Sequence, residues 1–243
     1  MKMDNAKPTR HDQAEHTREI ILHAASREFR LHGFDGASTA AITEAANVQA
    51  SLLYYHFKNK LGLYKAVVLS AIEQVAERAN EGLSSSGSAG ERLLRAVLLH
   101  FDRFVTHPEA MSLMQQEVLS SSGRTAEILA AMEAGILRPT IAKFGRTIVE
   151  GIEAGELRRV DWIRALGAIL GANANYFLTA PIFKIALETD PLSRRALEAQ
   201  RSGIVEFWAT ALFADPEQGA KAAALVLREL PFPQKPGGEV DVM

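Results

Sequence analysis

The sequence predicts an all-α protein with a small helical domain near the N-terminus and a larger helical bundle behind it. Apolar residues recur at intervals of three and four along most of the chain, which is the spacing of helices with one buried face. No segment alternates apolar and polar residues in the way that predicts a strand. With 243 residues, of which 47% are hydrophobic and 23% charged, the chain can bury a substantial core.

The first helix is expected at about 12–32. Asp12 and Glu15 have the spacing of a capping box at its start, and Gly33 is expected to stop it. Its apolar face is formed by residues four apart: Ile21, Ala25 and Phe29.

Two short helices are expected next, at about 39–47 and 49–57. Ser38 or Thr39 can cap the first of them, and Asn47 makes the turn into the second. The long helix that follows, at about 61–81, has apolar residues on its inner side: Tyr64, Val67, Val68, Ala71 and Val75.

The rest of the chain continues the helical pattern. The glycine- and serine-rich stretch 81–90 predicts a loop, and Pro139 is expected to kink or break the helix that contains it. Further helices are expected at about 91–106, 109–121, 124–154, 161–187, 191–214 and 216–229. The domain division that follows is a flexible N-terminal arm (1–15), a small helical domain (16–62), a larger helical domain (63–230) and a disordered proline- and glycine-rich tail (231–243).

Composition narrows the class of protein. The absence of cysteine excludes disulfides and thiolate chemistry and fits a cytoplasmic location. The N-terminus has no apolar core, so no secretory signal is expected. The most apolar window, 162–183, is interrupted by Arg164, Asn173 and Asn175, which predicts a buried helix rather than a membrane span.

The net charge of −2 does not by itself predict nucleic-acid binding. Residues 1–60 hold 8 Lys and Arg against 7 Asp and Glu, whereas the remainder holds 19 against 22. Residues 48–60 contain two lysines and no acidic residue. A local basic patch on a mildly acidic protein is sufficient for phosphate contacts.

Two short helices joined by a tight turn, with a third packed across them, form a helix-turn-helix. Eight or nine residues in the second short helix make a rod of roughly 12 Å, comparable to the ~12 Å width of the major groove. Its inward residues should hold it to Phe29 and Phe34. The expected inward positions are Ile42, Ala45 or Ala46, Val48, Leu53 and Phe57.

Three segments in this order resemble the DNA-binding domain of TetR-family transcriptional regulators: "IILHAASREFRLHGFDGAST", "AAITEAANV" and "LLYYHFKNKLGLYKAV". The resemblance covers about residues 17–68 and rests on the spacing of many apolar, glycine, tyrosine and lysine positions. Beyond this region the chain is similar to the family only in helical layout and length.

The resemblance implies a role for each matching position. Thr39 and Lys60 match phosphate-contacting positions, and the aromatic run matches positions that contact phosphate and sugar along the groove. Position 40, often a base-reading residue in the family, is Ala40 here, so base readout should rest on the N-terminal end of the second helix. The predicted DNA-binding residues are Thr39, Gln49, Ala50, Ser51, Leu52, Tyr54, Tyr55, His56 and Lys60.

The resemblance also implies a C-terminal bundle that forms a homodimer and holds a small-molecule effector. Small residues in 161–187, together with 191–214, predict the dimer interface, although the same glycines could serve packing within one subunit. The effector is expected to be apolar or aromatic, with a hydrogen bond to Asn173 or Tyr176. Its predicted binding residues, which could instead be ordinary core, are Phe101, Phe104, Met111, Met114, Gln115, Asn173, Tyr176 and Phe177.

The sequence therefore predicts a ligand-responsive regulator that binds a palindromic double-stranded DNA operator, in the family's usual sense a repressor. The alternatives are an activator, or a helical ligand-binding or scaffold protein without DNA binding. His100 and His107 lie seven apart with Asp102 between them, but this spacing does not supply enough converging ligands for a metal site. No catalytic residues, metal or cofactor are expected.

Overall fold

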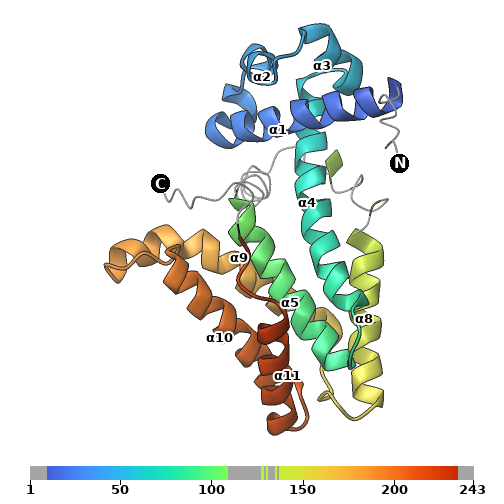
Figure 1. Cartoon of the computed structure of the whole chain (residues 1–243), viewed down its shortest axis with the longest axis vertical. Helices are drawn as coiled ribbons and strands as arrows, with labels where there is room; N and C mark the ends of the chain where they lie inside the picture. Colours follow the sequence, from blue (N-terminus) through green and yellow to red (C-terminus); the bar gives the residue numbers. More distant parts are fainter. Residues whose placement is uncertain (1–9, 109–126, 129, 131–134, 136, 235–243) are drawn as a thin grey trace, which may run out of the picture. The chain divides into compact units, whose positions relative to one another are not determined.

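The computed structural model describes residues 10–108, 127, 128, 130, 135 and 137–234. These residues are mostly helical and contain no named strand, only an isolated bridge between Leu157 and Phe213 (Figure 1). The chain divides into two compact units, and the division falls within one long helix, after Ala71. In the described residues, unit 1 comprises 10–71 with 127 and 128, and unit 2 comprises 72–108, 130, 135 and 137–234. The predicted all-α class is confirmed.

Unit 1 contains the predicted group of small helices. Its elements are α1 (Arg10–Gly36), α2 (Thr39–Ala45), α3 (Ala50–Phe57) and the first part of α4 (Lys60–Ser84). Helix α1 begins at Arg10, inside the stretch 1–15 expected to be a flexible arm, so Asp12 lies in its first turn rather than at its cap. Gly33 interrupts α1 with a φ of 64°, a left-handed conformation that glycine adopts without strain.

The core of unit 1 is built around three aromatic rings. The ring of Tyr64 on α4 packs edge-on against Phe29 and Phe34, with centroids 5.0 Å and 5.1 Å away. Most of the predicted inward positions are buried, including Ile42, Ala46, Leu53 and Phe57. Of the alternatives Ala45 and Ala46, the structure buries Ala46 and leaves Ala45 exposed. One expectation fails in part, because Val48 is only half-buried.

Unit 2 is a bundle around one central helix. Helix α5 (Ala89–Thr106) contacts each of the other long helices of the bundle that follow it: α8 (Leu137–Glu153), α9 (Trp162–Ala186), α10 (Arg194–Leu212) and α11 (Pro216–Glu229). Gly82 lets α4 approach α5 closely, since a Cβ there would lie 2.4 Å from the backbone nitrogen of Ala96. Thirteen of the 18 residues of α5 are buried, so α5 is the central helix of unit 2.

Two of the predicted boundaries differ in the structure. The expected loop 81–90 is shorter, because α4 continues to Ser84 and Ser88 with Glu91 forms a capping box for α5. The expected helix 124–154 is interrupted by a bend at Gly135, which places Pro139 in the first turn of α8, where proline is tolerated. The helix expected at 109–121 lies outside the described residues.

Helix α9 is not the buried helix that its composition predicted. By length and composition alone, α9 could cross a membrane. One side of the helix, with Ala165, Ile169 and Asn173, nevertheless packs into unit 2. The remaining surface is open: Ile163 is 62% exposed and Ile182 is 64% exposed. The apolar composition therefore reflects a face that no residue of the described chain covers.

The end of unit 2 is held to the bundle beyond α11. The side chains of Leu230 and Phe232 pack against the core, and the Arg194 guanidinium lies over the Phe232 ring at 5.4 Å. The Pro231 carbonyl accepts a hydrogen bond from Arg201. The first residues of the expected disordered tail, 231–243, are thus fixed by contacts, and residues 235–243 lie outside the described part of the chain.

Candidate functional site

The turn between α2 and α3 fixes the angle at which α3 is presented. Asn47 adopts a φ of 51°, a left-handed conformation that asparagine tolerates better than most residues. The turn is closed by backbone bonds from Asn47 N to the Glu44 carbonyl and from Val48 N to the Thr43 carbonyl, both 3.0 Å. These local bonds make α2, the turn and α3 a preformed helix-turn-helix.

One face of α3 is buried and the opposite face is open. Leu53 and Phe57, four apart, are buried, and the Arg18 guanidinium covers the Phe57 ring at 5.6 Å. Ser51 and Tyr55, also four apart, project about 160–200° away from Leu53 around the helix. Tyr55 is 78% exposed. The helix is thus anchored by apolar side chains and presents an uncharged polar and aromatic surface.

The N-terminal ends of the two short helices are held in different ways. Ser38 caps α2 by accepting a hydrogen bond from Ala41 N, and its own N–H donates to the Glu28 carboxylate at 2.9 Å. Thr39 therefore occupies the first helical position, with its side chain partly exposed. Gln49 precedes α3 without a side-chain capping bond, so its amide group is not used to cap the helix.

Lys60 begins α4 and has a structural contact as well as an exposed charge. Its Nζ donates to the Asp35 carbonyl at 3.2 Å and lies 5.1 Å from the centre of the Phe34 ring. An ammonium group has three donors, so a phosphate can still be bound by the others. This anchoring to the end of α1, just beyond Gly33, was not predicted from the sequence.

All nine predicted DNA-binding residues are at least partly exposed on α2, α3 and the start of α4. Gln49, Ala50, Ser51 and Leu52 at the N-terminal end of α3 are exposed, as are Tyr54 and Tyr55. Thr39, His56 and Lys60 are half-buried. The geometry is compatible with the predicted contacts, whose individual roles stay predictions.

Unit 2 gathers five of the eight predicted effector residues. The Phe177 ring of α9 lies 5.1 Å from Phe101 and 5.6 Å from Phe104, both on α5, and 5.5 Å from Tyr176. Asn173 lies one turn before Phe177 on α9 and is fully buried. Met111, Met114 and Gln115 lie outside the described residues. We call Phe101, Phe104, Asn173, Tyr176 and Phe177 the aromatic cluster.

The polar groups of the aromatic cluster are already partly engaged. The Tyr176 hydroxyl donates to the Pro191 carbonyl at 2.5 Å, and burial raises the pKa of this tyrosine. The Asn173 amide nitrogen donates to the Val97 carbonyl and lies 3.0 Å from His100 Nδ1. The His100–Asn173 contact was not predicted from the sequence, because the two residues are 73 positions apart.

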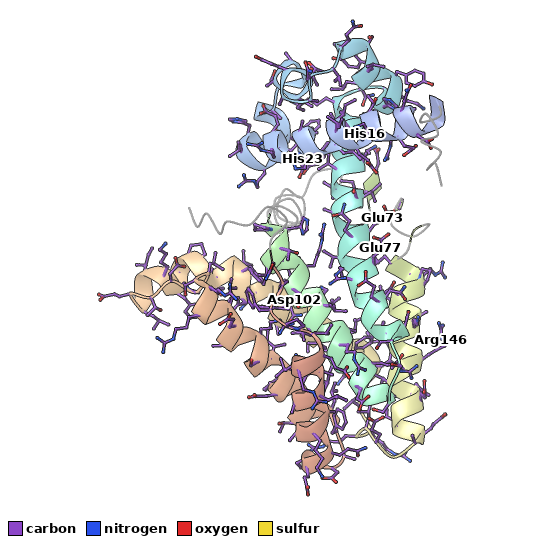
Figure 2. The ribbon with its side chains drawn as sticks, in the orientation of Figure 1. His16, His23, Glu73, Glu77, Asp102 and Arg146 are labelled. Carbon is purple, nitrogen blue, oxygen red and sulfur yellow. The ribbon has the colours of Figure 1, made fainter. Side chains whose placement is uncertain are left out.

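A buried ion pair joins α5 to α10 beside the aromatic cluster. The Arg201 guanidinium donates to both oxygens of Asp102 at 2.8 Å and 2.9 Å, and Asp102 lies on α5 (Figure 2). Burial raises the pKa of the Asp102 carboxyl, while the bonds from Arg201 oppose this change. His100 and Asp102, weighed above as metal ligands, thus face different partners. Among the described residues no group of three His, Asp or Glu side chains could hold a metal ion.

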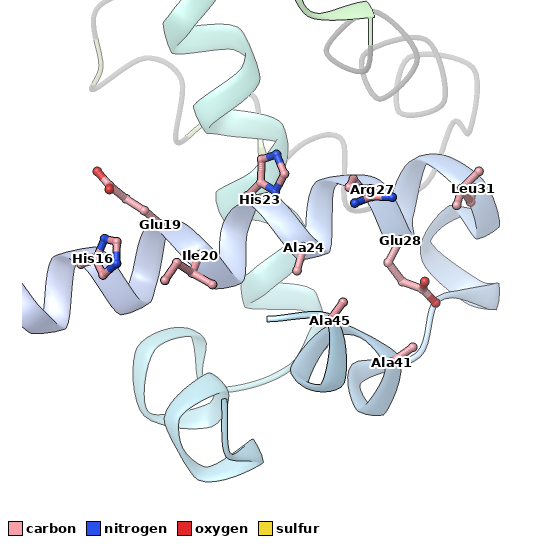
Figure 3. A pocket seen from close by; sticks show the side chains of 10 residues that line it. All are labelled: His16, Glu19, Ile20, His23, Ala24, Arg27, Glu28, Leu31, Ala41 and Ala45. Carbon is pink, nitrogen blue, oxygen red and sulfur yellow. The ribbon is translucent and has the colours of Figure 1, made fainter. Parts of the chain in front are cut away.

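Two cavities are described, and neither is lined by the aromatic cluster. One, of about 460 Å³, is an open hollow between α1 and α2 whose lining includes His16, His23 and Arg27 (Figure 3). The other, of about 470 Å³, lies between the start of α5 and α11 and includes Glu156 and Lys221.

Known families match both units. The family "Bacterial regulatory proteins, tetR family" matches residues 21–67, and "Tetracyclin repressor-like, C-terminal domain" matches residues 90–207. The chain belongs to the TetR family of transcriptional regulators. The first match spans all nine predicted DNA-binding residues, from Thr39 at the start of α2 to Lys60 at the start of α4.

Relatives of this TetR-family chain include both a repressor and an activator of transcription. The HTH-type transcriptional repressor NicS of Pseudomonas putida is 31% identical over 138 residues, 54% of this chain and 65% of NicS. The HTH-type transcriptional activator FasR of Mycolicibacterium smegmatis is 28% identical over 116 residues, 47% of this chain and 52% of FasR. The chain thus spans about half to two thirds of these curated relatives.

Solved structures support the fold of this TetR-family chain. The transcriptional regulator FadR from Bacillus subtilis in complex with stearoyl-CoA matches with a TM-score of 0.58 and 23% identity, over 76% of this chain and 98% of FadR. At this identity the match shows a shared fold. The family consists of DNA-binding regulators, so this chain is a helix-turn-helix transcriptional regulator and not an enzyme.

Proposed function

We propose that the protein is a cytoplasmic repressor that binds a palindromic operator as a homodimer and is released by a small apolar or aromatic effector. The observation that carries this proposal is the exposed face of α3, which presents Ser51 and Tyr55 away from its anchoring side, with the exposed Gln49 just before the helix. Eight helical residues on a fixed turn are of the right length to enter a major groove.

Replacing Tyr55 by Ala should weaken binding to the promoter DNA next to the protein's own gene about 10-fold. Tyr55 is 78% exposed, so the change removes a groove contact with little effect on folding. Lys60→Gln should instead lower the salt slope of binding by roughly 1, because a phosphate contact by a cation releases a counterion. Fluorescence anisotropy over a range of salt concentrations measures both effects.

The control for these variants is Leu31→Ala, which changes a 63% exposed side chain on α1 rather than on α3. It should bind the promoter fragment like the unmodified protein. If the unmodified protein bound this DNA without salt dependence, or if Tyr55→Ala bound equally well, α3 would not be the reading helix.

The open surfaces of α9 and α10 support the dimer. Ile163 and Ile182 on α9 and Phe207 on α10 are each more than 60% exposed, and the Cβ positions of Gly167, Gly171 and Gly203 have no neighbour within 4 Å. Exposed apolar side chains beside bare backbone suit close packing of a second copy. One helix-turn-helix makes few contacts, so two half-sites about 34 Å apart require this pairing.

Phe207→Glu is expected to raise the dimer dissociation constant about 100-fold or more. The substitution would place an unpaired carboxylate in an apolar interface. Sedimentation equilibrium of the full chain measures the change. Leu31, which is also 63% exposed in the unmodified protein, provides the control, and the Leu31→Glu variant should remain dimeric. If Phe207→Glu remained dimeric, the dimer interface would lie elsewhere.

Activation of transcription is a second candidate function, because FasR is an activator whereas NicS is a repressor. Repression is the proposal, since displacement from an operator needs only that the effector favour the state that does not bind DNA. A coupling of ~1–3 kcal/mol per effector would reduce operator affinity roughly 5- to 150-fold. A reporter gene behind the bound promoter distinguishes the two, because deleting a repressor raises its expression.

A further inference from the structure

Asn173 carries a buried hydrogen-bond acceptor that nothing in the described chain satisfies. The residue is 0% exposed, and its Oδ1 has no hydrogen-bond partner. The orientation of the amide is set by the Val97 carbonyl, which can only accept and therefore requires the NH₂ group at 3.0 Å. Rotating the amide would place two oxygens against each other, so Oδ1 cannot be satisfied in that way.

His100, which lies beside Asn173, is a neutral side chain. Its Nδ1 lies 3.0 Å from the Asn173 nitrogen and accepts a hydrogen bond from it, which leaves the imidazole proton on Nε2. Burial lowers the pKa of His100 to about 4, so the ring carries no charge near neutral pH. Asn173 and His100 therefore form an uncharged polar pair.

Among the described residues, the contacts that His100 and Asn173 make are with an aromatic ring and a backbone carbonyl rather than with a cation. The Phe104 ring lies edge-on to His100 at 5.1 Å, and Phe177 lies against Phe101 and Phe104. The nearby Arg201 is bound bidentately to Asp102 and to the Leu230 carbonyl. A carboxylate placed beside Asn173 Oδ1 would face an unpaired oxygen and the neutral His100, and these groups would not compensate for its lost hydration.

We propose that the effector is an uncharged molecule with an aromatic or apolar body and one hydrogen-bond donor, of the phenol type, that pairs with Asn173 Oδ1. This rests on the proposed effector function of the aromatic cluster and specifies its ligand class. The ligand packs against the rings of α5 and α9 and satisfies an acceptor that the protein itself leaves unpaired. Because pairing a buried acceptor is favourable, the donor sets specificity while the rings supply the apolar contact.

Four probes of similar shape test this proposal on the full chain: para-propylphenol, its methyl ether, propylbenzene and para-propylbenzoate. Isothermal titration calorimetry is carried out without DNA, so the result does not depend on operator binding, which is measured separately. The expected result is that the phenol binds at least 10-fold more tightly than the ether or propylbenzene, equivalent to about 1.4 kcal/mol, and that the benzoate does not bind. The ether matches the phenol in shape and lacks only the donor.

Asn173→Leu introduces an apolar side chain of similar size that has no acceptor, so the phenol should lose its advantage over the ether. The comparison between phenol and ether in the unmodified protein stands even if this variant does not fold. Equal binding of the neutral probes, preference for the benzoate, or no binding of any probe would overturn the proposed ligand class. If the ligand class fails but the protein still binds the operator, the proposed function as a regulator stands. If the protein does not bind the operator, the proposed function fails, and the calorimetry still tests the ligand class by itself.

Discussion

Replacing Arg201 by methionine is expected to lower the free energy of unfolding by about 3–5 kcal/mol. The guanidinium is 5% exposed and holds Asp102 through two hydrogen bonds, while it also donates to the Leu230 and Pro231 carbonyls. Methionine preserves much of the apolar volume but leaves the Asp102 carboxylate buried without a partner. Urea unfolding followed by circular dichroism measures the change.

Two variants separate the ion pair from the loss of a long side chain. Arg194→Met removes an arginine from the same helix that makes an exposed bond to Glu198 and a contact with the Phe232 ring, and exposed contacts of these kinds contribute about 1 kcal/mol or less each. The double variant Asp102→Leu with Arg201→Met should recover much of the lost stability, because it removes the unpaired charge. If Arg201→Met cost no more than Arg194→Met, the buried pair would not hold α5 to α10.

The arrangement of unit 1 could be predicted from the sequence because its determinants are local. The four-residue spacing of Ile21, Ala25 and Phe29 and the turn at Asn47 involve neighbours in the chain, and the helix-turn-helix follows from them. Where two adjacent residues competed, as with Ala45 and Ala46, the sequence left both open, and the structure buries Ala46. Only one of two successive helical positions can face the core, and side-chain size does not distinguish two alanines.

The polar contacts of unit 2 could not be predicted because each joins residues far apart in the sequence. Asp102 and Arg201 are 99 positions apart, and His100 and Asn173 are 73 apart. Periodicity indicates which helix face is buried, but it does not reveal which helix covers it. The sequence likewise predicted a buried α9 from its apolar residues, whereas an exposed apolar helix surface can equally be an interface for a second copy of the chain.

Acidification should lower the stability of the protein through His100, by a total of about 3 kcal/mol between pH 6.5 and pH 4. Burial lowers the pKa of His100 from 6.5 to about 4 in the folded chain. The unfolded chain therefore takes up a proton as the pH falls through 6.5, whereas the folded chain does not until about pH 4. Protonation favours the unfolded state within this window, and the loss is complete near its lower limit.

His100→Gln isolates this contribution, because glutamine does not titrate and its side-chain oxygen can still accept the hydrogen bond from Asn173. Subtracting the variant's unfolding free energy from that of the unmodified protein at each pH removes the contributions of other groups, including Asp102, whose pKa is raised. As the pH falls, the unmodified protein should lose unfolding free energy relative to the variant, by about 1.4 kcal/mol per pH unit at its steepest. A difference independent of pH would mean that His100 titrates alike in both states and is open to water in the folded protein. The Asn173–His100 pair would then be hydrated, and its unpaired oxygen would need no ligand.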